Sequence, residues 1–373
     1  MTDVIVVGLG AVGSATLYQL ALAGVRAIGI DRFHPPHDRG SSHGETRITR
    51  QAIGEGAQYS PYALRSHAIW RTLEAETGER LLLECGFLGV DTSGGLSVLH
   101  GKPGFLDTTI AAAEQHGIAH ERLSPAEARR RFPQFAIPDE AQVYHEPGGG
   151  LVFPEACIRA QLGRAVALGA ELHVDEQVLT LEEDAGGVRV VTTRGAYQAA
   201  RAVVTAGGWT LGLIGERLSH LRLLRQVLHW FAPEDPARWD AARTPTYIWT
   251  HGAGPDDSFY GFPMVQGLTP GVKVATEQYA DATPQPELID RQVAPAEVTT
   301  MWRDHVAGRL TGVTATALKG TVCFYTMAPH GDFLIDDQPD AGRIMTVSAC
   351  SGHGFKHSAG LGEAIAARIE AAS

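Results

Sequence analysis

Buried strands and an apolar helix are visible in the hydrophobic pattern at the start of the chain. Residues 3–7 contain a nearly continuous apolar run, which is typical of a strand buried on both faces of a parallel sheet. An apolar segment rich in small residues over 11–22 predicts a helix, and the run over 26–30 predicts a second strand. The three segments form a βαβ unit. Further strands are predicted over 172–174, 177–181, 188–192 and 201–209.

Three glycines and one acid indicate that this unit binds a dinucleotide. Gly8, Gly10 and Gly13 lie between the first strand and the helix. In such a motif the glycines allow a tight turn, close backbone approach to a pyrophosphate and close packing of helix on strand. The helix N-terminus stabilises the phosphates, and Asp31 can accept a hydrogen bond from a ribose hydroxyl. An ordinary glycine-rich turn is the alternative, but both strands and the acid occur in register with the motif.

The proline content and the length of the amphipathic stretches change in two segments of the chain, which indicates two domains. At 373 residues the chain is too long for one ordinary core. Segments 79–145 and 213–311 carry more proline and longer amphipathic stretches than the rest. We therefore expect an α/β protein with a Rossmann-like cofactor domain formed by 1–78, 146–212 and 312–373. The other two segments combine into an α+β substrate domain with a mixed or antiparallel sheet.

Composition and charge exclude several classes of protein. The chain is 44% hydrophobic and 20% charged, as in globular proteins. A net charge of -11 argues against a nucleic-acid partner, and no apolar run reaches the roughly 20 residues of a membrane helix. No signal peptide precedes the first strand, so a cytoplasmic location is expected. The four cysteines lack CxxC and metal-ligand spacing, so we expect reduced thiols and no metal site.

A second glycine-rich turn favours FAD over NAD as the cofactor. Gly352 and Gly354 precede an apolar segment over 360–369 that predicts a helix. A nicotinamide cofactor is bound within one compact fold, whereas the longer FAD commonly needs segments from both ends of a chain. We therefore expect the flavin end of FAD at this turn. Cys323 precedes the turn and is a candidate thiol for covalent attachment.

Several segments resemble one enzyme family over essentially the whole chain. They are residues 8–13, 35–37, 40–50, 54–56, 260–263, 321–326, 333–336 and 351–356. The chain resembles the monomeric sarcosine oxidase and N-methyl-L-tryptophan oxidase group of FAD-dependent amine oxidases. The resemblance implies oxidation of an N-methyl amino acid by O2, which yields the primary amine, formaldehyde and hydrogen peroxide. It also implies FAD bound through its 8α-methyl group to Cys323; otherwise this cysteine is one more small buried residue.

The resemblance also implies roles for individual residues. Arg50 and Lys356 are implied to hold the substrate carboxylate, for which the planar fork of arginine is suited. Lys273 is implied to activate oxygen, with Arg47 beside it near the flavin ring, because fixed cations stabilise the negative charge that develops there. For each single arginine, a solvated surface charge is the alternative.

Further side chains are implied to surround the substrate and the flavin. His353 is implied to tune the protonation of the amine, which must lose its proton before hydride leaves. Plain core packing is the alternative for the aromatic residues and histidines. The remaining implied contacts are Tyr260 and Tyr325 around the substrate, and Ser41, His43, Val178 and Lys356 around the cofactor.

Two departures from the family pattern leave the substrate open. Family members usually have a histidine four residues after the matched lysine, where this chain has Glu277, and a carboxylate there disfavours a bare glycine-like anion. The segment 247–251, with Trp249, also differs. Sarcosine, N-methyltryptophan, another N-methyl amino acid and a cyclic imino acid all remain candidates.

Two other functions compete with an oxidase. One is a flavin dehydrogenase that passes electrons to a carrier protein. The other is a structural nucleotide-binding subunit, which has no need for the cations Arg47, Arg50, Lys273 and Lys356. The family is often monomeric, so a monomer is the expected state.

Overall fold

A mostly parallel sheet forms one half of the molecule, which is described here from a computed structural model covering residues 2–99, 102–337 and 342–371. The predicted βαβ unit is confirmed as β1 (Thr2–Val7), α1 (Ala11–Leu22) and β2 (Ala27–Ile30). Both β2 and β14 (Ala196–Val204) pair with β1 in parallel. The other strands of this sheet are β11 (Glu171–His173), β12 (Val178–Asp184), β13 (Gly187–Thr192), β21 (Leu334–Asp337) and β22 (Ile344–Ser348).

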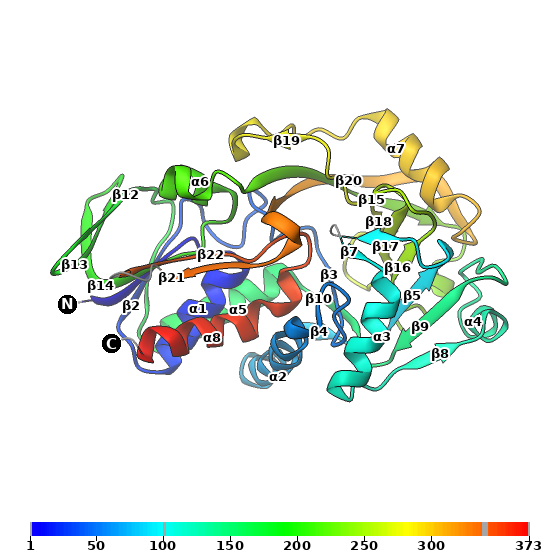
Figure 1. Cartoon of the computed structure of the whole chain (residues 1–373), viewed down its shortest axis with the longest axis horizontal. Helices are drawn as coiled ribbons and strands as arrows, with labels where there is room; N and C mark the ends of the chain where they lie inside the picture. The colour runs from blue at the N-terminus through cyan, green and yellow to red at the C-terminus, as the bar shows by residue number, and fades with distance from the viewer. Residues whose placement is uncertain (1, 100–101, 338–341, 372–373) are drawn as a thin grey trace.

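Helices α1, α5 (Pro154–Ala167) and α8 (Ser358–Ala371) lie together beside this sheet (Figure 1). The small residues of α1 allow this close packing, since a Cβ atom on Gly362 of α8 would lie 2.6 Å from the Cβ of Ala15. Apolar residues of the helices and of β1 form one shared core. The remaining helices are α2 (Ser60–Thr77), α3 (Phe105–His116), α4 (Pro125–Arg131), α6 (Thr210–Ile214) and α7 (Pro295–Met301).

A mixed sheet forms the other half, as predicted for the substrate domain. Its strand order is β19-β15-β18-β17-β16-β5-β9-β8, with β20 on the other edge of β15. All pairs are antiparallel except β16 with β5. The strands are β5 (Phe87–Asp91), β8 (Glu121–Leu123), β9 (Gln142–Glu146), β15 (Arg222–Pro233), β16 (Thr246–Thr250), β17 (Ser258–Phe262), β18 (Val272–Ala275), β19 (Ala282–Thr283) and β20 (Val313–Met327).

The register of this sheet gathers several predicted site residues on one face. Lys273 and Ala275 of β18 share a face because side chains alternate along a strand. Tyr260 of β17 lies directly opposite Ala275. The register continues across β15 to β20, where Cys323 and Tyr325 lie on the same face.

Two small elements join the halves. A small sheet contains β3 (Arg47–Thr49), β10 (Gly150–Val152) and β4 (Leu82–Leu83), and a hairpin contains β6 (Val98–Leu99) and β7 (Lys102–Pro103). By sheet membership, β20 groups with the mixed sheet, whereas the sequence assigned 312–373 to the cofactor domain. The division into two domains stays a prediction.

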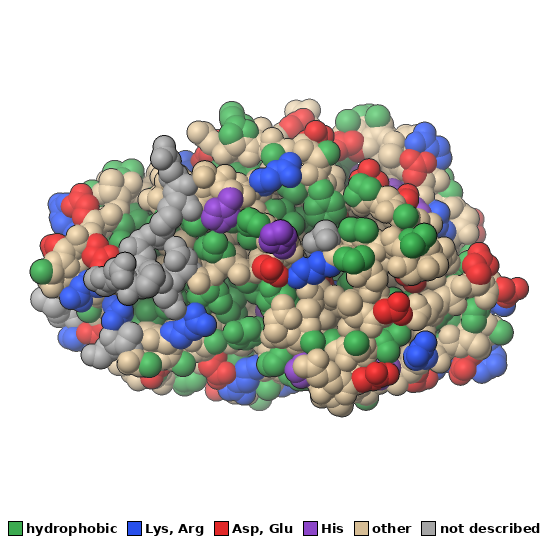
Figure 2. Space-filling view, in the orientation of Figure 1, with side chains coloured by type: hydrophobic (Ala, Val, Ile, Leu, Met, Phe, Trp, Pro, Cys, Tyr) green, Lys and Arg blue, Asp and Glu red, His purple; other side chains and the backbone are tan. Residues whose placement is uncertain are grey.

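The described surface mixes charges of both signs. Figure 2 shows acidic and basic side chains interspersed around the rim of the molecule, with hydrophobic side chains nearer its middle. Among the described residues, none of the helices has the length and hydropathy needed to span a bilayer.

Candidate active site

A cavity of about 540 Å³ opens at the carboxyl ends of β1 and β2. Gly8 has a φ of +88°, which favours glycine, and a Cβ atom there would lie 2.6 Å from Ala206 Cα. Gly13 lies behind this turn, where a Cβ atom would come within 1.8 Å of the Gly8 carbonyl oxygen. The glycines therefore hold the turn tightly against α1 and leave its outer side open to a ligand.

Asp31 fixes the glycine turn from the end of β2. Its carboxylate accepts hydrogen bonds from the backbone N–H groups of Leu9, at 2.7 Å, and Phe33, at 2.8 Å. Asp31 also lines the cavity, as expected of an acceptor for a ribose hydroxyl. No acidic side chain lies in the first turn of α1, so the partial positive charge of this helix end is available to a phosphate.

The second glycine turn also contributes to the lining of the cavity. Gly352 and Gly354 line it, together with Cys350 and Phe355. A Cβ atom on Gly354 would lie 1.8 Å from the Ala349 carbonyl oxygen, so this turn is also tightly packed. The chain thus supplies a cavity with one glycine turn from each end of the sequence, and its donors and open backbone fit an extended dinucleotide such as FAD.

Cys323 lies on β20 beside this cavity but is itself buried. Its side chain packs with Leu228, Trp230 and Ala275. Burial raises the pKa of the Cys323 thiol, and the nearby charge of Arg47 acts in the opposite direction. Strand β20 is also tied to the loop that precedes β3, since the Ser41 hydroxyl donates to the Phe324 carbonyl at 2.6 Å.

Lys273 is a buried cation held by the loop that precedes β3. Its ammonium group donates to the carbonyl oxygen of Gly44 at 2.7 Å and to that of Thr46 at 2.8 Å. It also lies 4.3 Å from the ring centroid of Phe262, within cation–π range. Burial, followed by the charge of Arg47, lowers the pKa of Lys273 well below its usual range.

Arg47 reaches the cavity from the first position of β3, directly after this loop. Its guanidinium group donates to the carbonyl oxygens of Ser41, at 2.8 Å, and Thr46, at 2.9 Å. Glu155 of α5 holds the loop from the other side by accepting from the backbone N–H of Gly44 at 2.7 Å. Backbone contacts therefore position both cations, and Arg47 lines the cavity.

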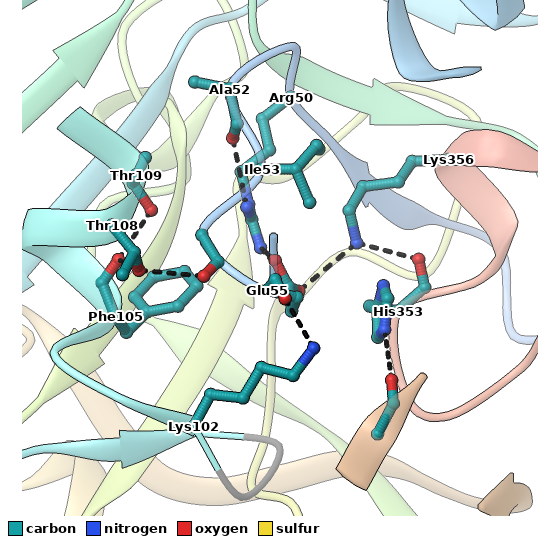
Figure 3. A network of polar contacts seen from close by, with 12 residues as sticks. Arg50, Ala52, Ile53, Glu55, Lys102, Phe105, Thr108, Thr109, His353 and Lys356 are labelled. Carbon is teal, nitrogen blue, oxygen red and sulfur yellow. Dashed lines mark hydrogen bonds and ion pairs between the residues drawn. The ribbon is translucent and has the colours of Figure 1, made fainter. Parts of the chain in front are cut away.

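Arg50 and Lys356 share one buried carboxylate (Figure 3). Arg50 Nη2 donates to both carboxylate oxygens of Glu55 at 2.7 Å, and Lys356 Nζ lies 3.6 Å from Glu55 Oε1. The exposed fractions are 1% for Arg50, 2% for Glu55 and 6% for Lys356. Burial lowers the pKa of Lys356 to about 8, and the charge of Glu55 opposes that shift.

The loop that carries Glu55 is fixed by two further contacts. Lys102 of β7 donates to the Glu55 carbonyl oxygen at 2.6 Å and forms an ion pair with Asp332 at 2.8 Å. The Thr108 hydroxyl donates to the Gly54 carbonyl at 2.8 Å. Figure 3 shows Arg50, Lys102 and Lys356 approaching Glu55 from three different segments.

A row of hydroxyl groups leads from the mixed sheet to Glu277. The Tyr260 and Tyr325 hydroxyls lie 3.4 Å apart, and Tyr325 donates to Glu277 Oε1 at 3.2 Å. The Tyr279 hydroxyl donates to the other oxygen of Glu277. Burial raises the pKa of both Tyr260 and Tyr325, so these hydroxyls keep their protons.

The two predicted histidines differ in their surroundings. Burial lowers the pKa of His43 to about 3, so this side chain is neutral near pH 7. The His353 ring contacts the Gly331 carbonyl through Nε2 at 2.9 Å and stacks on Phe333 with ring centroids 4.7 Å apart. His353 also accepts from Lys356 through its backbone carbonyl at 2.8 Å, which ties it to the cation pair.

The structure brings the predicted residues into two adjoining groups. Within the described part of the chain, some predicted cofactor residues do not line the cavity: Gly13, His43, Cys323 and Lys356. Tyr325 belongs to both groups, because it lines the cavity and bonds to Glu277. The residues that do line the cavity are Gly8, Gly10, Asp31, Ser41, Arg47, Val178, Tyr325, Gly352 and Gly354.

Some residues of the site had no assigned role in the sequence. Glu55 stands between two glycines in a segment that resembles the family, which was the only signal for it. Residues 284–287, from the segment assigned to the substrate domain, also line the cavity, and no motif indicated this. Trp209 lines it as well and donates to Glu287 at 2.8 Å.

A comparison with known protein families agrees with a cavity that fits FAD. The profile of the family described as FAD dependent oxidoreductase matches residues 3–368. The chain belongs to this FAD-dependent oxidoreductase family. The expected cofactor, FAD, and the expected class of enzyme are thereby confirmed.

Curated relatives of the oxidoreductase match nearly its whole length. The monomeric sarcosine oxidase of Streptomyces avermitilis is 37% identical over 371 residues, which cover 98% of this chain and 92% of that protein. The N-methyl-L-tryptophan oxidase of Yersinia pestis is 35% identical over 370 residues, which cover 98% and 94%. The predicted membership of this group is confirmed.

Solved structures share the fold of the oxidoreductase. The open form of NikD, an amino acid oxidase essential for nikkomycin biosynthesis, has a TM-score of 0.83 at 24% identity and covers 100% of this chain and 94% of that one. L-proline dehydrogenase from P. horikoshii has a TM-score of 0.79 at 16% identity, with coverage of 100% and 94%. The predicted fold class is confirmed.

Proposed function

We propose that the oxidoreductase oxidises the secondary amine of an N-methyl amino acid with O2. The substrate, O2 and water give the primary amino acid, formaldehyde and hydrogen peroxide. Sarcosine and N-methyltryptophan type substrates are suggested by the names of the two curated relatives. A cytoplasmic monomer is part of this proposal.

The buried cations Arg50 and Lys356 carry the proposal. Together with Glu55 they leave one surplus positive charge, which a substrate carboxylate balances. Arg50 Nε is buried and has no hydrogen-bonding partner among the described residues, so it is a donor that a carboxylate can satisfy. This cation pair adjoins the flavin cavity, which supports a role in holding an amino acid there.

The reaction also needs an active site that excludes water and a substrate amine in its neutral form. FAD, when bound, supplies the electron acceptor for the hydride removed from the carbon next to nitrogen. The aromatic rings of Tyr260 and Tyr325 form a wall that excludes water from the amine. The amine must be neutral when it reacts, and we assign His353 to tuning that proton, through its position beside Lys356.

Lys273 and Arg47 are the cations that we assign to the oxygen half of the reaction. Both are held by backbone carbonyl groups, and Lys273 is buried. Fixed positive charge in such a site stabilises negative charge that develops on reducing O2. This assignment favours an oxidase over a dehydrogenase that passes its electrons to a carrier protein.

Covalent attachment of the flavin at Cys323 is a further part of the proposal. Strand β20 brings Cys323 beside the cavity, two residues before Tyr325, which lines it. Acid-precipitated protein is expected to stay yellow, and Cys323→Ser is expected to release its flavin on precipitation. Measured flavin in the supernatant of the native protein would contradict the attachment, while Cys350→Ser serves as the matched cysteine control.

Peroxide release across secondary amino acids of increasing bulk tests the proposed function. We expect release with N-methyl amino acids and formaldehyde in equal amount. The alternative is an oxidase or dehydrogenase that acts on a cyclic or bulkier amino acid, and Glu277 is the observation that favours it over a sarcosine enzyme. Flavin reduction by cyclic imino acids alone, without formaldehyde, would establish that alternative.

A further inference from the structure

Glu155 lies behind the turn that holds Lys273. It occupies the first turn of α5, directly after Pro154, and its side chain is half-buried. Its Oε1 atom accepts hydrogen bonds from the backbone N–H groups of Gly44, at 2.7 Å, and Glu45, at 3.1 Å. The reaction proposed above assigns no role to this carboxylate.

One peptide group lies between Glu155 and Lys273. The N–H of Glu45 and the carbonyl of Gly44 belong to the same trans peptide bond, in which these two groups point in opposite directions. The N–H donates to Glu155, while the carbonyl oxygen accepts from the Lys273 ammonium group at 2.7 Å. The carboxylate and the ammonium group therefore polarise this peptide group from its two ends, and each strengthens the hydrogen bond of the other.

The same turn supplies three acceptors for Lys273. They are the carbonyl oxygens of Gly44 and Thr46, at 2.7 and 2.8 Å, and the Thr46 hydroxyl oxygen, at 3.1 Å. An ammonium group has three N–H donors, so all three oxygens can accept from it at once. Any displacement of the turn would therefore change every one of these contacts.

The turn needs support because its backbone conformation is unfavourable. Gly44 has a φ of +97°, and Glu45 has one of +74°, which is uncommon for a residue with a side chain. Such a conformation persists where the surrounding contacts fix it. Glu155 fixes the backbone of Glu45, and Lys319 pairs with its carboxylate at 2.7 Å.

Burial and a neighbouring cation both oppose a positive charge on Lys273. Burial lowers the pKa of Lys273 well below its usual range, and the charge of Arg47 on β3 lowers it further. The charge of Glu155 acts in the opposite direction. The other side chains that act on this ammonium group come from the turn and from three strands of the mixed sheet, and they are His43, Glu45, Trp230, Phe262 and Cys323.

We propose that Glu155 is a positioning residue that holds Lys273 in place through the peptide group between Gly44 and Glu45 and favours its charged form. Within the described part of the chain, Glu155 does not line the cavity, so its effect is carried by the turn. Its consequence for the enzyme rests on the proposed function, in which Lys273 stabilises negative charge during the reaction with O2.

A carboxylate in the first turn of a helix also has a simpler explanation. It interacts favourably with the partial positive charge of the helix N-terminus. Glu127 has the same kind of position in α4, a helix that also begins with proline, and it lies 3.6 Å from Arg130. Glu127→Gln is therefore the matched control for the loss of a first-turn carboxylate.

The charge of Lys273 can be followed without substrate or O2. NMR of holoenzyme isotopically labelled at its lysine Cε atoms gives few signals, and Lys273→Met identifies the one that belongs to Lys273. We expect this signal to titrate at a lower pH in Glu155→Gln than in the native enzyme, because a nearby negative charge is removed. Glu127→Gln should titrate like the native enzyme. The lysines of the chain are Lys102, Lys273, Lys319 and Lys356.

Stopped-flow absorbance measures the consequence for the reaction with O2. Re-oxidation of the reduced enzyme should slow as the pH rises and Lys273 loses its charge. In Glu155→Gln this decrease should begin at a lower pH, which makes the variant about tenfold slower than the native enzyme in that range. Anaerobic reduction by substrate should be unchanged, and Glu155→Gln should add nothing to the effect of Lys273→Met.

Glu155→Ala separates the position of Lys273 from its charge. At a pH low enough for Lys273 to be charged in every variant, Glu155→Gln should react with O2 nearly as fast as the native enzyme, since its amide oxygen still accepts from the turn. Glu155→Ala should remain about ten- to hundredfold slower, because the turn that aligns the ammonium group is no longer held.

The outcomes distinguish this proposal from the proposed function. Equal titration of Lys273 in the native enzyme and Glu155→Gln would overturn the proposal, as would equal rates for Glu155→Gln and Glu155→Ala at low pH. A lowered titration of Lys273 in Glu155→Gln, together with a reaction with O2 that is the same in Lys273→Met as in the native enzyme, would support the effect of Glu155 on Lys273. That result would contradict only the role of Lys273 in the proposed function.

Discussion

Two buried lysines have central roles in the reaction proposed for this oxidoreductase. Burial lowers the pKa of each and places each ammonium group against particular partners in the protein. Lys273 donates to backbone carbonyls, whereas Lys356 faces a carboxylate. Burial lowers the pKa of both, and for Lys356 the charge of Glu55 limits the shift. The two residues are therefore expected to respond differently to pH and to substitution.

We predict that carboxylate binding weakens as the pH rises through about 8. Lys356 has a pKa of about 8, so it is charged below that value and loses its charge above it. An anion binds the charged form, and the dissociation constant of caproate should rise by up to about tenfold per pH unit above this value. Titration of flavin absorption measures it. Lys356→Met should bind caproate weakly at every pH, and an unchanged pH dependence in that variant would assign the titration to another group.

A second prediction concerns Lys273. Lys273→Met should slow the reaction of the reduced enzyme with O2 by about a hundredfold or more, since a preorganised cation is lost, while anaerobic reduction by substrate changes less. Stopped-flow absorbance separates the two steps. Lys319→Met is the matched control, because Lys319 contacts Trp230 on the same sheet but pairs with Glu45. Equal losses in both steps for Lys273→Met would contradict its role.

Among the elements, the turn between β1 and α1 is constrained by close contacts. The apolar run, the glycines and Asp31 are near neighbours in sequence, and local patterns predicted this unit correctly. Glu55 was not predicted as the partner of Lys356, because that contact depends on packing between segments about 300 residues apart. The same long-range packing brings residues 284–287 to the cavity.

Gly13→Ala is predicted to yield protein with little or no FAD. Its new Cβ atom would lie 1.8 Å from the Gly8 carbonyl oxygen, which is a backbone atom, and 2.5 Å from the Thr205 hydroxyl oxygen, so the turn would have to shift. The ratio of flavin to protein absorbance after purification measures the effect. Gly163→Ala in α5 is the control, since no neighbouring atom lies within 4 Å and alanine favours a helix. A normal flavin content in Gly13→Ala would mean that the turn adjusts.

At the scale of the whole molecule, buried neutral histidines make the free energy of unfolding depend on pH. Burial lowers the pKa of His67 and His229 to about 4 and that of His43 to about 3. Between about pH 4 and 6.5 the unfolded chain therefore binds more protons than the folded one, so the free energy of unfolding falls as the pH falls. Each such histidine contributes a slope of about 1.4 kcal/mol per pH unit.

We predict that His229→Leu flattens this dependence. His229 lies in the mixed sheet, and neither ring nitrogen has a hydrogen-bonding partner among the described residues. In the variant, the slope of the free energy of unfolding against pH should be smaller by about the contribution of one histidine, while the free energy of unfolding at neutral pH stays the same. Urea unfolding from pH 7 to pH 4.5 measures both quantities. An unchanged slope would show that His229 already titrates normally.

The arrangement of the cavity has a consequence for how the enzyme matures in the cell. Part of its lining comes from residues 8–12 and another part from segments between residues 347 and 355. During synthesis the ribosome delivers the first part long before the second, so a nascent chain has only an incomplete cavity until its last residues are made. Flavin uptake is therefore a late, post-translational event, and growth conditions that limit riboflavin should lead to accumulation of full-length apoprotein.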